Sequence, residues 1–313
     1  MKKRTVALLL ARGAFNGSSR PHAGLKYKAL MPVHGVPMVD YVMRALQESA
    51  AEKIFVVQGA DEKLEQVVGC HSKNVFINCE SNGSSYSHSL FSGLTKLADH
   101  YGPDGLQEID IMLVPCDVPF VNGGNFNRLM AANDDKDTDV CVSMIRSELL
   151  KESYPERDFK GLYYSDLGEN YCIQNFAFIR GRTLRAVFYG GKYTSEESGL
   201  HIPYNLLTDV AATADYLVSF RQTYYQIPLI LWEWLWRLAR KRYILQSLLM
   251  LGKLLRRRCT TQDYRRFVFL ASGLTADYIN TQEAELSFDI DRFEHLDALS
   301  DLKSRCSAAD STI

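Results

Sequence analysis

The sequence predicts an α/β fold, a three-layer sandwich in which a mostly parallel sheet lies between two layers of helices, with a helical insertion in the second half of the chain. Short apolar runs of the length of buried parallel strands alternate with segments of helical periodicity. Such recurring strand–helix units favour a parallel sheet covered by helices on both faces. At 313 residues and 46% hydrophobic content, the chain is long enough to bury a large core.

The first predicted strand, residues 5–10, is apolar throughout after its first residue and ends abruptly in a polar loop that contains glycine. The far end of this loop is basic, with Arg20, Lys26 and Lys28, and Pro37 then opens a helical pattern. A loop between a strand and a helix, with exposed backbone N–H groups and a nearby lysine, suits a phosphate. An ordinary solvated loop remains the alternative, because neither of the common glycine-rich phosphate-binding motifs is present.

The following segments continue the alternation. Further strands are predicted at residues 53–57, 74–79, 109–114 and 139–144, with helices at 61–68 and around Leu90, Leu94 and Leu97. In parallel sheets, ligands bind beyond the carboxyl ends of the strands. We therefore expect the loops at 12–28, 80–89 and 115–122 to converge on one site.

Charge and cysteine content restrict the function. A net charge of −1 gives no general attraction to nucleic acid, so no nucleic-acid partner is expected. The seven cysteines form no C-x-x-C pair and are typical of reduced thiols. The basic start followed by an apolar run imitates a signal peptide, but the run is too short, so we expect a cytoplasmic protein. The seven histidines show no metal-ligand spacing.

Several short motifs occur in a distinctive order. They are L-x-x-G at 10–13, Lys28-Ala29-Leu30 followed by Pro32, Gly35 and Pro37, S-L-x-x-G-L at 89–94, P-C-D-V-P around Asp117, and Phe288-Asp289-Ile290-Asp291 before Phe293-Glu294-His295-Leu296. Together they resemble the nucleotidyltransferases related to molybdenum-cofactor guanylyltransferase and sugar-nucleotide pyrophosphorylases, the MobA-like NTP transferases. The resemblance covers roughly residues 1–180 and 270–302 and implies a Rossmann-like sheet.

The resemblance also divides the chain. It implies a nucleotidyltransferase domain over residues 1–302, interrupted by a helical insertion at about 195–270, and a polar, frayed tail over 303–313. The sequence departs from the family's pattern in four places. Arg12 stands where a small residue is usual, Arg20 comes several residues late, Tyr27 replaces the proline before Lys28, and Arg292-Phe293 replaces Thr-Pro after Asp291.

The implied reaction is Mg²⁺-dependent transfer of a nucleoside monophosphate from an NTP to a phosphorylated small molecule, with release of pyrophosphate. The resemblance to guanylyltransferases implies GTP among the candidate nucleotides, although the residues do not identify the base. Two alternatives stay open. One is a nucleotide-sugar-dependent glycosyltransferase of the related fold, and the other is a non-catalytic nucleotide-binding relative in which the altered first loop no longer turns over substrate.

The resemblance implies a role for each matched residue. Lys28 neutralises phosphate charge, and Asp117 and Asp291 hold Mg²⁺, with Asp289 as the substitute for Asp291. The nucleotide is bound by Leu10, Ala11, Arg12, Gly13, Lys28, Asn82 and Ser89, and the acceptor by Asn175. Structural alternatives are a turn cap for Asp117 and helix capping for Asp291, Asn82 and Ser89.

The insertion carries two apolar runs, residues 227–236 and 244–255, each too short to span a bilayer. Many arginines and lysines and few acids surround them, which predicts a basic amphipathic helical pair. We expect this pair, residues 227–258, to pack against the core or a second copy of the chain in a homodimer. The alternatives are contact with a membrane surface and a lid over a lipid-linked or anionic acceptor.

Overall fold

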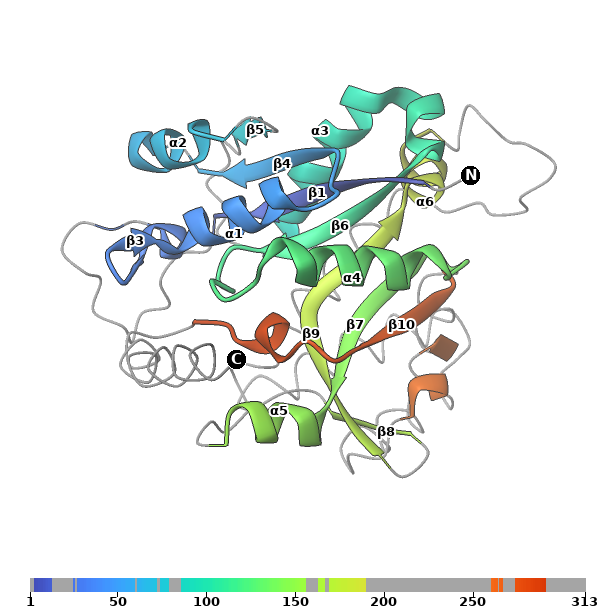
Figure 1. Ribbon diagram of the computed structural model, residues 1–313. Helices are drawn as coiled ribbons and strands as arrows, with labels where there is room; N and C mark the ends of the chain where they lie inside the picture. Colours follow the sequence, from blue (N-terminus) through green and yellow to red (C-terminus); the bar gives the residue numbers. More distant parts are fainter. Residues whose placement is uncertain are drawn as a thin grey trace, which may run out of the picture.

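The protein is described by a computed structural model whose core is a mixed eight-stranded sheet (Figure 1). The structure describes residues 3–12, 25, 27–59, 61–71, 74–78, 86–155, 163–166, 169–189, 260–263, 265–266 and 274–290. The strands of this sheet are β1 (Arg4–Leu10), β4 (Lys53–Gln58), β5 (Asn74–Asn78), β6 (Ile109–Pro115), β7 (Val140–Arg146), β8 (Tyr163–Asp166), β9 (Glu169–Arg180) and β10 (Ala276–Thr281).

Within the sheet, the strand order is β10-β7-β9-β6-β1-β4-β5, and β8 pairs with β9. Parallel pairing joins β6, β1, β4 and β5 on one side and β7 with β10 on the other. Between these two parallel sets lies β9, which runs antiparallel to both β6 and β7. The sheet is therefore mostly parallel, as predicted, and the carboxyl ends of β1, β4, β6, β7 and β10 all lie along one edge.

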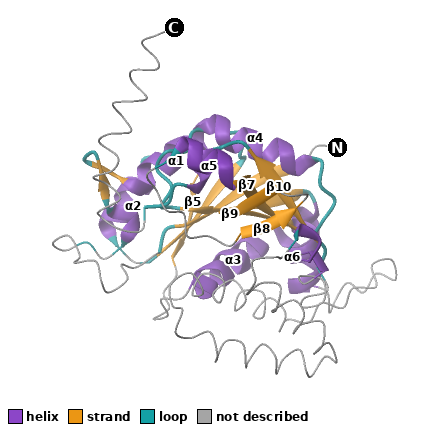
Figure 2. Ribbon diagram, turned by 90° about the horizontal axis from the view of Figure 1, so that it is seen from below, coloured by secondary structure: helices purple, strands orange, loops and turns teal. Residues whose placement is uncertain are grey.

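Helices cover both faces of the sheet (Figure 2). The described helices are α1 (Met38–Glu48), α2 (Glu62–Gly69), α3 (Tyr86–Gln107), α4 (Gly123–Asp134), α5 (Ser147–Ser153) and α6 (Gly181–Tyr189). In Figure 2, α3 and α6 lie on the opposite side of the sheet from the other four. Two 3₁₀ turns, η1 (Lys28–Leu30) and η2 (Ala284–Ser287), and a short hairpin of β2 (Pro32–Val33) and β3 (Val36–Pro37) complete the described elements.

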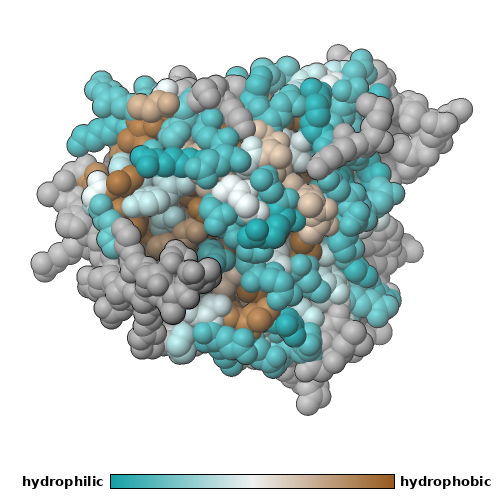
Figure 3. Space-filling view, in the orientation of Figure 1, coloured by the Kyte–Doolittle hydropathy of each residue, from teal (hydrophilic) through white to brown (hydrophobic). Residues whose placement is uncertain are grey.

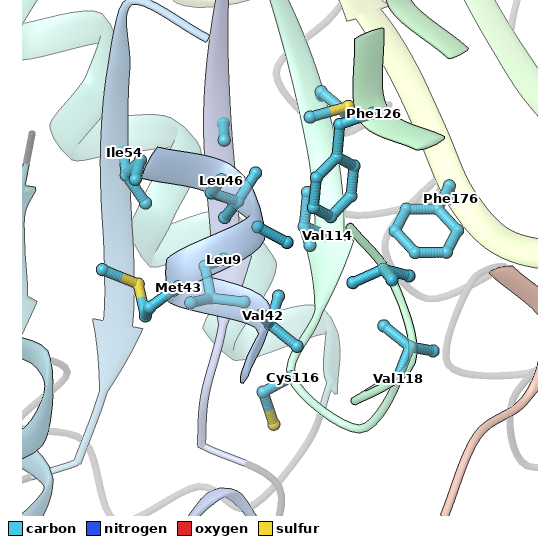
Figure 4. Packing of buried hydrophobic residues seen from close by; sticks show 14 of the residues in the cluster. Leu9, Val42, Met43, Leu46, Ile54, Val114, Cys116, Val118, Phe126 and Phe176 are labelled. Carbon is cyan, nitrogen blue, oxygen red and sulfur yellow. The ribbon is translucent and has the colours of Figure 1, made fainter. Parts of the chain in front are cut away.

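The alternation of side chains along the strands divides the core between the two faces. On β1, Ala7 and Leu9 point into the cluster beneath α1, α2 and α4, whereas Val6 and Leu8 point into the cluster against α3 and α6. Figure 4 shows the first cluster, where the α1 residues Val42, Met43 and Leu46 pack on the sheet. Burial on both faces explains why these strands are continuous apolar runs.

The predicted three-layer α/β class is confirmed, and β1, β4, β5, β6, β7, α1, α2 and α3 lie where the periodicity predicts strands and helices. Among the elements that were not predicted, two strands determine the order of the sheet. The antiparallel strand β9 separates the two parallel sets, and β10 returns from residue 276 to pair with β7. In Figure 1 the chain after β10, coloured red, leads toward the side of the molecule where β1 and β4 end.

Most of the predicted insertion at 195–270 and the tail at 303–313 lie outside the described residues, so the domain boundaries, the packing of 227–258 and the homodimer stay predictions. Residues 261–263 and 265–266 are helical. No helix in the described part of the chain is long and apolar enough to cross a membrane. On the face shown in Figure 3, polar residues surround separate apolar patches.

Candidate active site

Lys28 is the first residue of η1, and the chain around it is held on both sides. The amide of Leu30 donates to Tyr27 O at 3.2 Å, and the amide of Met31 donates to Lys28 O at 3.0 Å. Ala29 and Leu30 are buried in the cluster beneath α1. Because its neighbours are fixed in the core, Lys28 has little freedom except in its side chain.

Asp117 lies just beyond the end of β6. The register that pairs Pro115 with Leu10 of β1 places it next to the first loop. Its neighbours Cys116 and Val118 are 4% and 0% exposed and anchor the turn. The carboxylate of Asp117 therefore lies at the edge of the sheet and not inside it.

The Lys28 ammonium donates to Asp117 Oδ2 at 2.6 Å, and the two side chains are 12% and 19% exposed. A charge-assisted hydrogen bond of this length is among the strong ones in proteins. The contact joins residues 89 positions apart in the sequence. It brings together two of the predicted site residues, one cation and one carboxylate, at the carboxyl edge of the sheet.

The segment after η2 contributes a second carboxylate. The amide of Ile290 donates to the carbonyl oxygen of Asp117 at 2.9 Å, so residues 288–290 pass directly beside the end of β6. Phe288 is fixed there by Phe120 and Tyr154, whose ring centroids lie 5.0 Å and 4.9 Å from its own. Asp289 thereby lies next in sequence to a residue that contacts Asp117.

Asn175 faces the same segment from β9. Its Nδ2 donates to Asp289 Oδ2 at 3.4 Å; Asn175 is exposed, whereas Asp289 is 2% exposed. The strand pairing is irregular here, because residues 174–176 lie opposite Ser143 alone. Bulges of this kind are common beside active sites, where they redirect a side chain.

Gln174, the neighbour of Asn175, is buried and ties β9 to the segment that carries Asp289. Its Nε2 donates to Glu283 O and Ser287 Oγ, each at 2.9 Å, and its Oε1 accepts from Thr281 Oγ1 at 2.9 Å. We did not predict this role. The available signal was the alternation along β9, where Gln174 is the one amide among the inward-facing residues Cys172, Phe176 and Phe178.

Burial suppresses the chemistry of Cys116, the thiol closest in sequence to Asp117. Complete desolvation, reinforced by the negative charge of Asp117 and opposed by Lys28, raises the pKa of Cys116 to about 12. The thiol stays protonated at neutral pH and is a poor nucleophile. The reactive chemistry of this site therefore depends on charged oxygen and nitrogen groups.

Leu10, Ala11 and Arg12 lie at the end of β1, on the same edge as Lys28 and Asp117. The Ala11 amide donates to Val57 O at 2.8 Å, and Leu10 is buried, so the backbone here continues the sheet. Ser89 is buried in the first turns of α3. Gly13, Asn82 and Asp291 lie outside the described residues.

The side chains gathered here are suited to a hard cation. Carboxylate and amide oxygens are the ligands Mg²⁺ prefers in proteins, and Asp117, Asp289 and Asn175 supply them. Within the described ranges, no group of three or more His, Cys, Asp or Glu could hold a metal ion. A magnesium site in this set would rest on one or two carboxylates together with substrate phosphates.

Three comparisons place the chain among known proteins. Residues 7–247 match the model of the MobA-like NTP transferase domain, which is well over half of the chain. No curated protein matches.

Among solved structures, a hypothetical transferase from Thermus thermophilus is 16% identical with a TM-score of 0.59, and the match covers 93% of this chain and 99% of that one. At this identity the likeness concerns the fold.

Two further structures are less similar. CMP:2-keto-3-deoxy-manno-octonic acid synthetase complexed with CTP has a TM-score of 0.42 and 16% identity, covering 70% of this chain and 84% of its own. The 4-diphosphocytidyl-2C-methyl-D-erythritol synthase of Anaerococcus prevotii has a TM-score of 0.49 and 10% identity, covering 95% and 96%. The family model carries the assignment: the chain belongs to the MobA-like NTP transferase domain family and is a nucleotidyltransferase.

Proposed function

We propose that this nucleotidyltransferase moves a nucleoside monophosphate from an NTP to a phosphorylated small molecule and releases pyrophosphate, with Mg²⁺ as its cofactor. The observation that carries the proposal is the Lys28–Asp117 contact of 2.6 Å at the carboxyl edge of the sheet. Nucleotidyl transfer consists mainly of positioning and charge neutralisation, and this pair offers both a fixed cation and a carboxylate.

In the proposed reaction, an acceptor oxygen attacks the α-phosphorus of the NTP. The bond to the bridging oxygen breaks, and that oxygen leaves with its electron pair on pyrophosphate. Asp117 holds the ammonium of Lys28 in place before substrate arrives, so little reorganisation is needed when negative charge grows on the phosphates. Lys28 acts as a point charge on those oxygens.

The metal would be held by Asp117 with Asp291, or with Asp289 in its place. When bound, Mg²⁺ neutralises phosphate charge and orients the triphosphate. The contact between Ile290 and Asp117 supports a pairing of Asp117 with a carboxylate from this segment, because it brings the backbone next to Asp289 to the end of β6. Asn175, exposed beside Asp289, is proposed to contact the acceptor.

The nucleotide is proposed to bind over the end of β1, where residues 10–13 begin the first loop, with Asn82 and Ser89 contacting base and ribose. GTP is one candidate. Family membership favours this function over the glycosyltransferase alternative. That alternative would use a nucleotide already joined to sugar and release no pyrophosphate.

The test is a panel of four NTPs with Mg²⁺ and pooled phosphorylated metabolites, scored by pyrophosphate release. One NTP should give release that depends on both Mg²⁺ and an acceptor. Lys28→Ala should lower kcat more than it raises KM, because its charge acts mainly in the transition state. The matched control is Lys136→Ala, which removes a lysine paired with Asp277 at 3.3 Å.

Turnover of a nucleotide sugar with no pyrophosphate from any NTP would overturn the proposal in favour of the glycosyltransferase. Equal kinetic constants for Lys28→Ala and the wild type would remove Lys28 from the mechanism.

A further inference from the structure

Tyr27, the residue immediately before Lys28, has a large side chain that is almost wholly buried. Its backbone is extended, with φ −116° and ψ 139°, and it precedes the turn η1. The residue is 6% exposed and belongs to the core cluster beneath α1. Packing in the core therefore holds its ring in place.

The tip of the Tyr27 ring lies directly on the backbone of Gly59, the residue that follows β4. A Cβ added at Gly59 would come within 1.9 Å of Tyr27 Oη and 2.5 Å of Cζ. Real Cβ atoms do not approach other atoms so closely, so any side chain at position 59 would have to displace the ring. The ring occupies space that only glycine leaves open.

The order of the strands shows what this contact does. β4, β1 and β6 are neighbours in that order, and their carboxyl ends lie on one edge. The ring of Tyr27 is anchored at the end of β4, whereas the ammonium of the next residue, Lys28, reaches Asp117 beyond the end of β6. Residues 27 and 28 thus span the end of β1, where the first loop begins.

Burial on the other side of Lys28 completes the arrangement. Ala29 is 0% and Leu30 6% exposed, so the chain is anchored in the core directly before and directly after the lysine. A lysine has four rotatable bonds, and a displacement of its backbone would be amplified at the ammonium. A placement error of about 1 Å at a reacting group can cost about 10²-fold in rate.

From this juxtaposition we infer that Tyr27 is the positioning residue for Lys28: its ring, seated on Gly59, sets the place from which the ammonium reaches Asp117. The part of this inference that concerns rate rests on the proposed function, whereas the part that concerns geometry does not. The positioning element is the end of the side chain, Oη with Cζ, which packs against Gly59.

The first experiment measures the geometry without activity. Lys28 is acylated in the full-length native protein with an amine-reactive ester, and its labelling rate is followed by peptide mass spectrometry. Tyr27→Ala should raise the rate at least 5-fold, because the ammonium is released from Asp117. Gly59→Ala, which pushes the ring tip aside, should raise it about 2- to 3-fold. Tyr27→Phe, which keeps the ring and removes only the Oη nearest Gly59, should raise it less than Tyr27→Ala does.

Tyr189→Ala is the matched control for lost stability. This half-buried tyrosine of α6 donates to Ala98 O at 3.0 Å on the opposite face of the sheet. Its loss should leave Lys28 labelling unchanged, and urea unfolding of every variant shows whether stabilities match. If Tyr27→Ala does not fold, Tyr27→Leu takes its place, because it keeps apolar volume without reaching Gly59.

The second experiment measures the kinetic consequence. Tyr27→Ala should lower kcat about 10-fold and change KM for the NTP less than 3-fold. In a Lys28→Ala background, the same substitution should change kcat less than 2-fold, because Tyr27 acts through Lys28. The inference is overturned if Lys28 is labelled at the wild-type rate in Tyr27→Ala. It is also overturned if Tyr27→Ala lowers kcat as much in the Lys28→Ala background as it does in the wild type.

The two arms separate this inference from the proposed function. If no NTP gives pyrophosphate with the wild type, the proposed function fails, and the labelling rates alone then decide whether Tyr27 positions Lys28.

Discussion

β6 has a carboxylate near each end, and each carboxylate meets a cation from a distant part of the chain. Near its start, Asp110 binds Arg180, the last residue of β9, and just past its end Asp117 binds Lys28. The two pairs differ in burial. The side chains of Asp110 and Arg180 are 1% and 4% exposed, whereas those of Asp117 and Lys28 are 19% and 12% exposed.

The surroundings differ as well. Besides Asp110, the guanidinium of Arg180 donates to the carbonyl oxygens of Asn133 at 2.9 Å, of Thr138 at 3.3 Å, and of Lys136. These contacts join β6, β9, the end of α4 and the chain between α4 and β7. The Lys28–Asp117 pair instead lies among loops at the carboxyl edge of the sheet, where it meets solvent. The first pair connects elements of the fold, whereas a ligand can reach the second pair.

The largest expected effect is on the structural pair. Arg180→Met should lower the free energy of unfolding by about 3–5 kcal/mol, because it leaves the buried carboxylate of Asp110 with only the partly exposed Lys3, 3.9 Å away, as a counter-charge. Urea unfolding at neutral pH measures this. The control is Arg182→Met. Arg182 is 44% exposed and pairs with Asp137 at 2.8 Å and with Asp139 at 3.5 Å, and its loss should cost about 1 kcal/mol.

The double variant Arg180→Met with Asp110→Val sharpens this test. It should be more stable than Arg180→Met alone, because no buried charge is left. If Arg180→Met proved as stable as Arg182→Met, the distinction between the two ends of β6 would be lost.

Next in size is Asp117→Asn. We expect kcat/KM to fall by about 10²–10³-fold, on the order of 3–4 kcal/mol of transition-state stabilisation, because Lys28 loses its charged partner. The free energy of unfolding should change less than in Arg180→Met, since this pair is less buried than Asp110 and Arg180. Pyrophosphate release and urea unfolding measure the two quantities. Asp137→Asn, at an exposed position, is the control and should leave both near wild type.

A stability loss in Asp117→Asn as large as that of Arg180→Met, with unchanged kinetics, would show that both ends of β6 are structural.

Gln174→Leu should have an intermediate effect, because it removes the three hydrogen bonds that hold the chain from Thr281 to Ser287. We expect a loss of about 2 kcal/mol in the free energy of unfolding, at about 0.5–1.5 kcal/mol for each net bond. The apparent affinity for Mg²⁺ should also fall, since Asp289 follows on the same segment. Calorimetric titration with MgNTP measures this, with Asn133→Leu as the control for a buried amide at the structural end. An unchanged affinity in folded Gln174→Leu would separate this segment from the metal site.

The smallest expected effect concerns Asp139, which lies at the structural end just before β7. Burial would raise the pKa of this carboxyl, but hydrogen bonds from Thr275 and Thr183 and the charge of Arg182 outweigh it and lower the pKa below its usual value. A lowered pKa contributes stability above the unfolded-state value of about 3.9, and this stability is lost as the pH falls through the folded-state pKa.

Asp139→Asn should therefore reduce the loss of stability between pH 6 and pH 3 by about 1–2 kcal/mol, on the order of one hydrogen bond to a charged group. Urea unfolding across this pH range measures it. Asp137→Asn, which is exposed, should keep the wild-type pH profile, and an equal profile for both variants would contradict the assignment.

The parallel half of the fold was predictable because its signals are local. Each of β1, β4 and β6 is an apolar run buried on both faces, and each is followed by a helix with one apolar face. The position of β9 between β6 and β7 was not predictable, because an antiparallel strand is recruited by pairing with partners distant in sequence. Residues 276–281 likewise become β10 only because β7 offers an open edge.

At the site, Lys28 and Asp117 were predicted together, and the structure places them in contact. Whether they pair directly depends on how far each side chain extends, and the order of the motifs does not show this. Asp289 was considered only as a substitute for Asp291, and the contact of Ile290 with Asp117 could not be seen without β10 and η2. Nothing in the sequence predicts that Tyr27 packs against Gly59, except that position 27 has tyrosine where the family has proline.

The hydrogen bond from Ile290 to Asp117 also determines when the site is completed during biosynthesis. The two residues are separated by more than half the length of the chain. A ribosome delivers about 5–20 residues per second, and the β1–β6 half emerges first. Lys28 and Asp117 are thus both available long before Asp289 has been made. The proposed metal site consequently lacks its second carboxylate until β10 has been made and has joined β7.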